Sequence, residues 1–318
     1  TEPLFKAVAI RGEGVLETLH GLLVLLYKDL DRRHDFGRKF GISGREFLQG
    51  LISNDTDRIA PNCAIYAALL TPQGKYLHDF FVLQFAGALV LDCERERLDD
   101  LKKRLTIYKL RARVELNDLS DDFAVAAVTG DSTAEAFGLV AEPGRATTFV
   151  GGLVYVDPRL TAAGARAVLP RTEAKQTLAD AGFSVAGDGE YDALRLALGL
   201  PNGSLDLVVE KSILLESGFG ELNGVDWQKG CYMGQELTAR TKYRGLVKKR
   251  LVPVAVDGPL PEPGTPVMRD GKEAGEMRSG AGGRALALMR LEHLEDAGAT
   301  FTAGDAVISP EKPDWAEF

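Results

Sequence analysis

The sequence predicts an α+β protein that ends in a small β-barrel. Between residues 42 and 200, segments with helical periodicity alternate with apolar runs that pair as antiparallel hairpins. From Leu251 onward, glycine and proline punctuate short apolar runs, a pattern typical of a small barrel or sandwich. We therefore predict an N-terminal extension over residues 1–35, a main domain over 36–250 and a barrel domain over 251–318.

The composition excludes several classes of protein. Of the 318 residues, 45% are hydrophobic and 26% are charged, which is typical of a folded globular protein and not of a disordered or fibrous one. The formal net charge of −8 makes nucleic acid an unlikely partner, because such binders generally carry a basic surface. No apolar run approaches the roughly 20 residues of a spanning helix, so no membrane association is predicted.

The cysteines indicate the compartment. Cys63, Cys93 and Cys231 form no C-x-x-C pair, so the sequence predicts neither a disulfide scaffold nor a zinc ribbon. An odd number of free thiols is typical of a reducing compartment. We predict a cytoplasmic protein, or a protein of the mitochondrial matrix if the source is eukaryotic.

The first predicted elements are a helix and a hairpin. Ser43 and Glu46 form a capping box ahead of apolar residues at helical spacing, and the helix should end near residues 53–55. Apolar runs then flank the sequence Thr71-Pro72-Gln73-Gly74, in which proline second and glycine fourth suit a type I turn. The hairpin strands are predicted over 64–70 and 76–83.

The later elements follow from the same periodicities. The helix before Gly199 should end there, because glycine is favoured just after a helix. The glycine-rich residues 280–283 lack a phosphate-loop lysine and predict a β-turn. We predict strands over 89–91, 123–128, 153–156 and 166–169, and helices over 94–108, 172–180 and 191–198.

The most distinctive segment runs from Lys229 to Arg240. Two glycines indicate a tight turn, and the residues after Gly234 predict the start of a helix. Cys231 then lies beside Lys229 and just before a helix N-terminus, and both neighbours favour a thiolate, which is a nucleophile or a soft-metal ligand. The alternative is that Cys231 is a small buried apolar residue.

Two further features carry charge in unusual places. His78 and Asp79 interrupt an apolar strand whose alternation should turn one of them inward. The second feature is a run without acidic residues, which predicts either a local anion site or a solvated or interdomain surface. Its basic residues are Arg240, Lys242, Arg244, Lys248, Lys249 and Arg250.

These motifs resemble the YgfZ folate-binding family, whose members share a fold with the aminomethyltransferase of the glycine cleavage system. The sequence Lys229-Gly230-Cys231-Tyr232-x-Gly234-Gln235-Glu236 resembles the family signature. The flanking segments 215–225 and 238–241 resemble the branch that contains the mitochondrial iron–sulfur cluster assembly factor. Residues 47–55 and the hairpin from Tyr66 to Asp79 resemble the N-terminal part of the family.

The resemblance implies a GcvT-like ring of ferredoxin-like folate-binding modules followed by a β-barrel, with tetrahydrofolate bound in the ring. The transferase closes its hairpin with two acids, and here His78 takes the first position and Asp79 the second. The transferase also has a folate-contacting glutamate where this chain has Ala197. The residues that the resemblance assigns to folate are Asn54, Tyr66, Asp79, Lys229 and Arg240, with Asp79 and Cys231 as the reactive groups.

The leading functional hypothesis is a folate-binding protein that assists iron–sulfur cluster assembly together with an A-type carrier. Because a cluster usually takes four thiolate or histidine ligands, Cys231 is predicted to share a [2Fe-2S] cluster with that partner. One alternative is a tetrahydrofolate-dependent one-carbon transferase, with Asp79 handling the proton at the folate. The other is a tRNA-modification factor, suggested by the basic run and opposed by the net charge.

Overall fold

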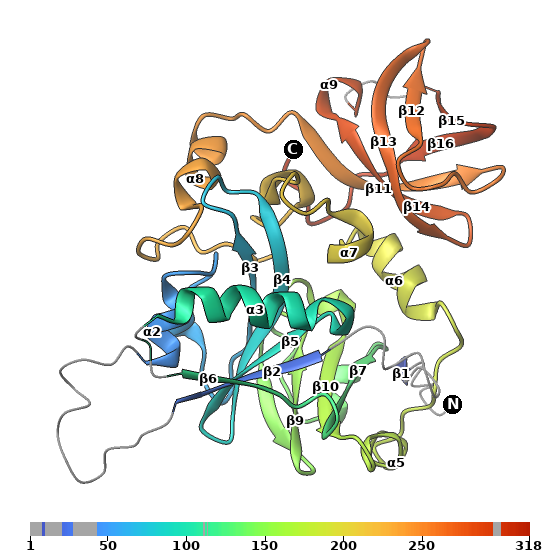
Figure 1. Cartoon of the computed structure of the whole chain (residues 1–318). Coiled ribbons are helices and arrows are strands. Elements are labelled where there is room, and N and C mark those ends of the chain that lie inside the picture. The colour runs from blue at the N-terminus through green and yellow to red at the C-terminus, as the bar shows by residue number, and fades with distance from the viewer. Residues whose placement is uncertain (1–7, 10–20, 28–42, 111, 113, 295–299) are drawn as a thin grey trace, which may run out of the picture. The chain divides into compact units, whose positions relative to one another are not determined.

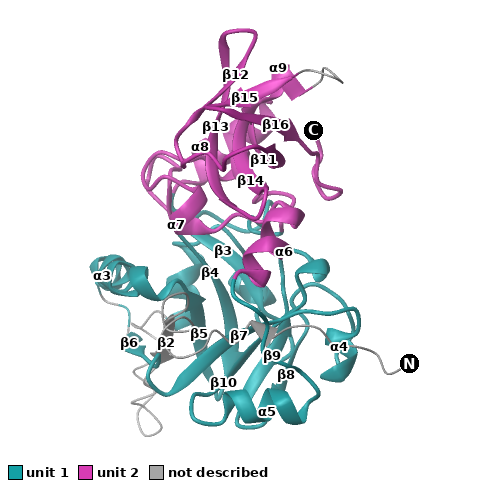
Figure 2. Ribbon diagram, turned by 90° about the vertical axis from the view of Figure 1, so that its right-hand side faces the viewer, with its two compact units in different colours: residues 1–69, 78–188, 223–233 teal, residues 70–77, 189–222, 234–318 magenta. Residues whose placement is uncertain are grey.

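The computed structural model describes residues 8–9, 21–27, 43–110, 112, 114–294 and 300–318. Its chain divides into two compact units (Figure 2). Unit 1 comprises the described residues within 1–69, 78–188 and 223–233. Unit 2 comprises residues 70–77, 189–222 and the described residues within 234–318, so it includes the tip of the first hairpin as well as the predicted barrel.

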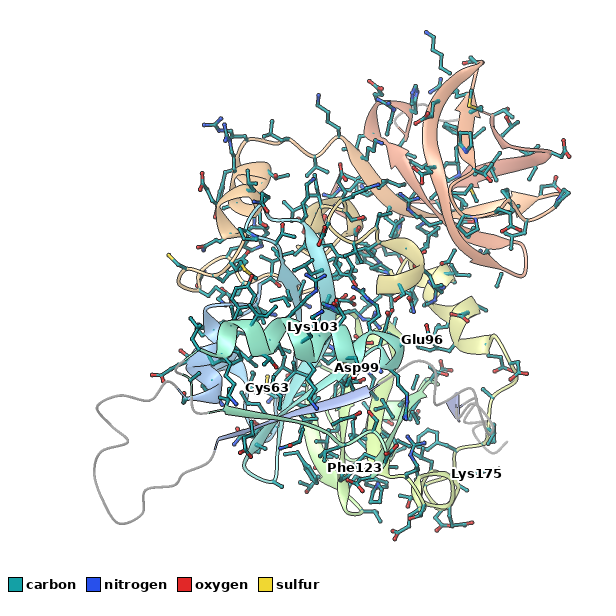
Figure 3. The ribbon with its side chains drawn as sticks, in the orientation of Figure 1. Cys63, Glu96, Asp99, Lys103, Phe123 and Lys175 are labelled. Atoms are coloured by element: carbon teal, nitrogen blue, oxygen red, sulfur yellow. The ribbon has the colours of Figure 1, made fainter. Side chains whose placement is uncertain are left out.

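The first sheet of the fold has the strand order β3-β4-β5-β2-β6. Helix α3 (Leu98–Lys109) crosses this sheet and buries Leu98, Leu101 and Leu105, while Asp99 and Lys103 lie on its exposed side (Figures 1 and 3). The strands are β2 (Gly21–Tyr27), β3 (Ile65–Leu70), β4 (Tyr76–Phe85), β5 (Ala88–Cys93) and β6 (Val114–Asp118).

The start of the first helix, the hairpin and the following helix are confirmed in this region, whereas the first helix ends at Gln49 rather than near residues 53–55 and β6 was not predicted. Helix α2 (Gly44–Gln49) begins at Ser43 with both halves of the capping box present. The turn of the hairpin closes with a hydrogen bond of 2.8 Å from the Gly74 amide to the Thr71 carbonyl. The predicted helix over 94–108 is a short 3-10 turn, Arg95–Arg97, continued by α3.

The structure differs from the prediction at the N-terminus. Within residues 1–35, where we predicted only an extension, β1 (Val8–Ala9) and β2 are both strands of the sheets. Strand β2 pairs on one side with β5 and on the other with β6. A short apolar run fits a strand as well as other structures, and its partners lie far along the chain, so local patterning does not identify it. The polar stretch 28–35 lies outside the described residues.

The second sheet has the order β1-β7-β10-β9-β8. Strands β7 (Phe123–Val128), β9 (Gly152–Val156) and β10 (Ala165–Pro170) confirm three predicted strands, whereas β8 (Ala146–Phe149) was missed. Two helices, α4 (Thr133–Ala136) and α5 (Ala174–Asp180), accompany this sheet. Its core includes a stacked pair of rings, Phe137 and Phe183.

The C-terminal strands close into a barrel in the order β11-β14-β13-β12-β15-β16, which confirms the predicted α+β protein with a C-terminal β-barrel. The predicted turn at 280–283 joins β13 to β14, with Gly282 and Gly283 both at positive φ as a tight hairpin requires. The strands are β11 (Lys249–Asp257), β12 (Pro266–Arg269), β13 (Lys272–Ala281), β14 (Arg284–Arg290), β15 (Phe301–Ala303) and β16 (Ala306–Pro310), with α9 (Leu291–Leu294) after β14.

Among the described residues of unit 2, three further α-helices lie outside the barrel. They are α6 (Glu190–Leu198), α7 (Gly203–Asp206) and α8 (Gln235–Tyr243). Gly199 ends α6 in the left-handed conformation, as predicted. Arg195 of α6 is buried and pairs with Asp206 of α7 at 3.0 Å, and Asp206 accepts hydrogen bonds from Ser279 of β13. These contacts connect α6 and α7 to the barrel. Helix α6 contains Ala197, the position at which the family resemblance implies a glutamate in the transferase.

The burial of His78 makes stability depend on pH. The imidazole is 3% exposed and lies 2.8 Å from Asp100 of α3. Burial, followed by the nearby Arg97, lowers the pKa of His78 from 6.5 to about 4. The imidazole takes up a proton near pH 6.5 in the unfolded state and only near pH 4 in the folded state. As the pH falls from 6.5 to 4, the free energy of unfolding should therefore decrease by up to about 3 kcal/mol.

Chemical denaturation from pH 7 to pH 4.5 measures this dependence. His78→Gln, which stays neutral throughout, should flatten the slope. The pKa of Asp100 is lowered from 3.8, so that carboxyl contributes mainly below this range. An equal slope in both proteins would assign the dependence to other groups.

Candidate functional site

Unit 1 contains a pocket of about 300 Å³. Its walls come from the segment after α2, the start of β3, the turn before β8, the residue two positions after β9, and a single residue of the segment that carries the signature cysteine. The lining residues are Asn54, Arg58, Cys63, Ala64, Ile65, Tyr66, Glu142, Pro143, Pro158 and Asn223.

Two asparagines hold the walls of the pocket together. Asn54 is buried, and its amide donates to the backbone carbonyls of Tyr66 and Asn223, both at 2.7 Å. The amide of Asn223 donates to the Pro158 carbonyl at 3.0 Å. Asn223 has a φ of 57°, a left-handed conformation that asparagine tolerates better than most residues. Asn54, which the family resemblance assigned to folate, lies in the pocket wall together with Asn223, to which no role was assigned from the sequence.

Tyr66 and Asp79 face each other across the hairpin. The Tyr66 hydroxyl donates to the Asp79 carboxylate at 2.8 Å, with Tyr66 fully buried and Asp79 half-buried. The strand alternation turns His78 inward instead, against Asp100. Asp79 does not itself line the pocket and reaches its wall through Tyr66.

Arg159 supports this wall from behind. Its guanidinium lies 5.5 Å from the centre of the Tyr66 ring and 5.1 Å from that of Phe81. Asp157 holds the guanidinium with two hydrogen bonds, at 3.0 and 2.7 Å, and both side chains are buried. A planar cation fixed by a carboxylate and stacked on aromatic rings restricts the rotamer of Tyr66.

A second buried network joins the two sheets of unit 1. Asp92 of β5 accepts hydrogen bonds at 2.7 Å from Tyr155 of β9 and from Arg166 of β10. The three side chains are at most 2% exposed. Burial, followed by the Asp92 charge, raises the pKa of Tyr155 well above its usual value, so its hydroxyl stays a donor.

Lys229 binds backbone rather than solvent. Its ammonium donates to the carbonyls of Gln49, Ile52 and Asn54 at 2.9, 2.7 and 2.8 Å, and its nitrogen lies 5.0 Å from the centre of the Tyr232 ring. An ammonium has three protons, and these contacts use all of them. Burial lowers the pKa of Lys229 from 10.5 to about 8.

The three cysteines differ in exposure. Cys231 is exposed, Cys63 is half-buried in the pocket wall, and Cys93 is buried. Burial, followed by the Asp92 charge, raises the pKa of Cys93 well above its usual value. Helix α8 begins four residues after Cys231, with Gly234 before it in the left-handed conformation, which confirms the predicted turn and helix. The position of Cys63 in the pocket had no sequence signal.

The basic run divides into two kinds of residue in unit 2. Arg250 is half-buried, donates to the Leu215 carbonyl and pairs with Glu221, both at 2.8 Å. The other members include an exposed group: Arg240, Lys242, Arg244 and Lys248.

The predicted site residues fall in both units. Unit 1 contains Asn54, Tyr66, Asp79, Lys229 and Cys231, and unit 2 contains Arg240.

Two kinds of feature are absent from the described residues. Among them, no group of three or more histidine, cysteine, aspartate or glutamate side chains could hold a metal ion. None of the helices in these ranges has the length and apolar character needed to span a bilayer.

Comparison with known proteins gives consistent matches. The sequence model of the CAF17 C-terminal beta-barrel domain matches residues 248–318. The mouse mitochondrial iron–sulfur cluster assembly factor IBA57 is 33% identical over 86% of this chain and 81% of its own length. A homologue from Mycosarcoma maydis is 35% identical over 67% of this chain, and the chain spans 54% of that relative. The names of these relatives place them in mitochondria.

A solved structure shares the fold. The glycine cleavage system aminomethyltransferase T from Bartonella henselae superposes with a TM-score of 0.72, covering 94% of this chain and 85% of that one. The two sequences are 16% identical, so the likeness concerns the fold alone.

Proposed function

Because the chain belongs to the family of the iron–sulfur cluster assembly factor IBA57, we propose that it assists the maturation of iron–sulfur proteins while holding a reduced folate. The observation that carries this proposal is the breadth of the match, since the mouse and human relatives align over 86% and 80% of this chain. Their names describe iron–sulfur cluster assembly, and this chain retains the exposed cysteine of the signature.

The number of exposed cysteines supports a function together with a partner protein. A cluster usually takes four thiolate or histidine ligands, and Cys231 is the exposed member of the three cysteines. The described residues offer no cluster of three suitable side chains around it. We propose that Cys231 contributes one ligand to a [2Fe-2S] cluster that an A-type carrier also binds. The cluster is then cargo that passes through a shared site.

The pocket fits the pterin end of a folate. Its volume lies at the lower end of the range for small-molecule sites, and its walls combine apolar surface with amide groups. Asn54, Asn223 and Tyr66 would hold the ring, and Asp79 would fix the Tyr66 hydroxyl. A bound tetrahydrofolate would supply a carrier for one-carbon groups, while the residues of the chain bind and orient it.

A one-carbon transferase is the second candidate, favoured by the retained Asp79 beside Tyr66. Two differences between this chain and the transferase pattern argue against a one-carbon transferase. Ala197 is exposed on α6 and supplies no carboxylate, and His78 is buried on Asp100 rather than paired with Asp79. Release of methylene-tetrahydrofolate from a glycine-derived donor would favour the transferase. A tRNA role would require binding that weakens steeply with salt.

The relatives also bear on location. They are mitochondrial proteins, which supports the mitochondrial matrix for a eukaryotic source and does not support the predicted cytoplasmic location. We propose the matrix assignment for that case.

Anaerobic reconstitution with iron and sulfide tests the proposed function. The protein alone, an A-type carrier alone and their mixture are compared by absorption spectroscopy after gel filtration. A cluster that co-elutes with both proteins only in the mixture supports the proposal. Turnover of an aminomethyl donor without any effect of the carrier would favour the transferase.

Folate binding should depend on Asp79. Asp79→Ala removes the carboxylate that holds the Tyr66 hydroxyl in a charge-assisted hydrogen bond, so we expect a loss of affinity of about tenfold or more. Tyr66→Phe deletes the hydroxyl through which Asp79 reaches the pocket wall and keeps the carboxylate, so it should lower the affinity by a similar factor. Calorimetry with a reduced folate measures both. Equal binding by Asp79→Ala and the wild type would remove Asp79 from the site.

A further inference from the structure

The segment that carries Cys231 rests on a segment that lines the pocket. We call residues 223–233 the Cys231 segment and residues 49–54 the supporting segment. They lie far apart in the sequence and both belong to unit 1. The first contact pair is at the pocket itself, where the Asn54 side chain donates to the Asn223 carbonyl at 2.7 Å.

Further hydrogen bonds continue away from the pocket. The Ser53 hydroxyl donates to the Gly224 carbonyl at 2.6 Å, and the Asp226 amide donates to the Ser53 carbonyl at 3.0 Å. At the far end, the Met233 amide donates to the Gly50 carbonyl at 3.1 Å. Cys231 lies between the last two of these contacts in the sequence and has an exposed side chain.

Lys229 is the centre of this arrangement. Its three hydrogen bonds reach both ends of the supporting segment, from Gln49 to Asn54. A charge-assisted hydrogen bond is stronger than a neutral one, and a buried ammonium that lost these carbonyls would remain without compensation. Lys229 is therefore the residue whose removal should most weaken the contact between the two segments.

We propose that Lys229 is a positioning residue that couples the pocket to Cys231. We call the Cys231 segment seated when it is hydrogen-bonded to the supporting segment as described above. A ligand that contacts Asn54 and Asn223 stabilises this seated arrangement, and the seated segment presents the thiol to a partner. The coupling is reciprocal, so a partner that binds Cys231 in the seated arrangement raises the affinity of the pocket for its ligand. This inference rests on the proposed folate site and adds how that site communicates with the thiol.

Hydrogen exchange of the full-length protein tests the coupling, with 5-formyltetrahydrofolate as the ligand and calorimetry to confirm binding. In the wild type, saturating ligand should raise protection of the Asp226 and Met233 amides about fivefold or more, in the range of ordinary allosteric couplings. In Lys229→Met the rise should fall below about twofold, and protection without ligand should drop in the Cys231 segment and not in β9.

Two further variants separate positioning from general stability. Lys242→Met removes an exposed lysine of α8 and should behave as the wild type. Lys229→Arg keeps the charge and several donors, and should restore part of the ligand response. If Lys229→Met is too unstable to study, the wild-type response and Lys229→Arg still decide the question.

The outcomes distinguish the coupling from the folate site. Ligand that binds by calorimetry without changing protection of the Cys231 segment overturns the coupling and leaves the folate site standing. A full ligand response in Lys229→Met overturns the role of Lys229. Absence of ligand binding to the wild type overturns the folate site, and the coupling with it.

Discussion

Replacing Cys231 by serine should abolish the cluster that the protein holds together with an A-type carrier, while its folding and folate binding stay at wild-type values. The side chain is exposed, so its replacement removes no buried contact. A serine hydroxyl does not ionise at neutral pH and is a poor ligand for iron compared with a thiolate. We expect the cluster absorption of the mixture to fall below about a tenth of the wild-type value.

The other two cysteines provide the controls for this experiment. Cys63→Ser alters the pocket wall and Cys93→Ser a buried position, and neither should abolish the shared cluster. Thermal unfolding shows whether each variant is folded. If Cys231→Ser retains the cluster, the shared-ligand proposal fails. If the variant loses stability while its function stays intact, Cys231 is a structural residue.

Arg166→Met should lower the free energy of unfolding by about 3–5 kcal/mol. The guanidinium of Arg166 lies 2.7 Å from the carboxylate of Asp92, which is 0% exposed, and 4.7 Å from the centre of the Phe81 ring. Methionine fills part of the space but leaves the buried carboxylate without its countercharge. Urea denaturation at pH 7 measures the loss.

The ion pair between Arg284 and Glu311 is the matched control, because both side chains are about two-fifths exposed. Water screens that pair, so Arg284→Met should cost about 1 kcal/mol or less. A loss below about 1 kcal/mol for Arg166→Met would mean that the Asp92 carboxyl is neutralised or solvated in the variant.

Local sequence signals were sufficient for much of the fold. The capping box at Ser43, the turn at 71–74, the helix end at Gly199 and the glycine pair at 282–283 each act through backbone conformations or hydrogen bonds within a few residues. Such signals are visible in any short window of sequence. The signature around Cys231 likewise indicated the turn and the start of α8.

The contacts of the site depend on residues that the sequence alone does not bring together. The pattern identified Lys229 as a cation beside a thiol, whereas the tertiary structure directs its ammonium to three carbonyls about 175 to 180 residues earlier. Asn54 contacts Asn223 across a separation of 169 residues, and Asp92 contacts Arg166 across 74 residues. The sequence by itself determined many of the elements, the barrel and the exposed-thiol motif, because these rest on short-range periodicity and turn chemistry. It did not predict the strands β1, β2, β6 and β8. Only the tertiary structure decided which polar groups are buried and paired, because a buried polar group is satisfied by whichever partner the packed sheets bring to it.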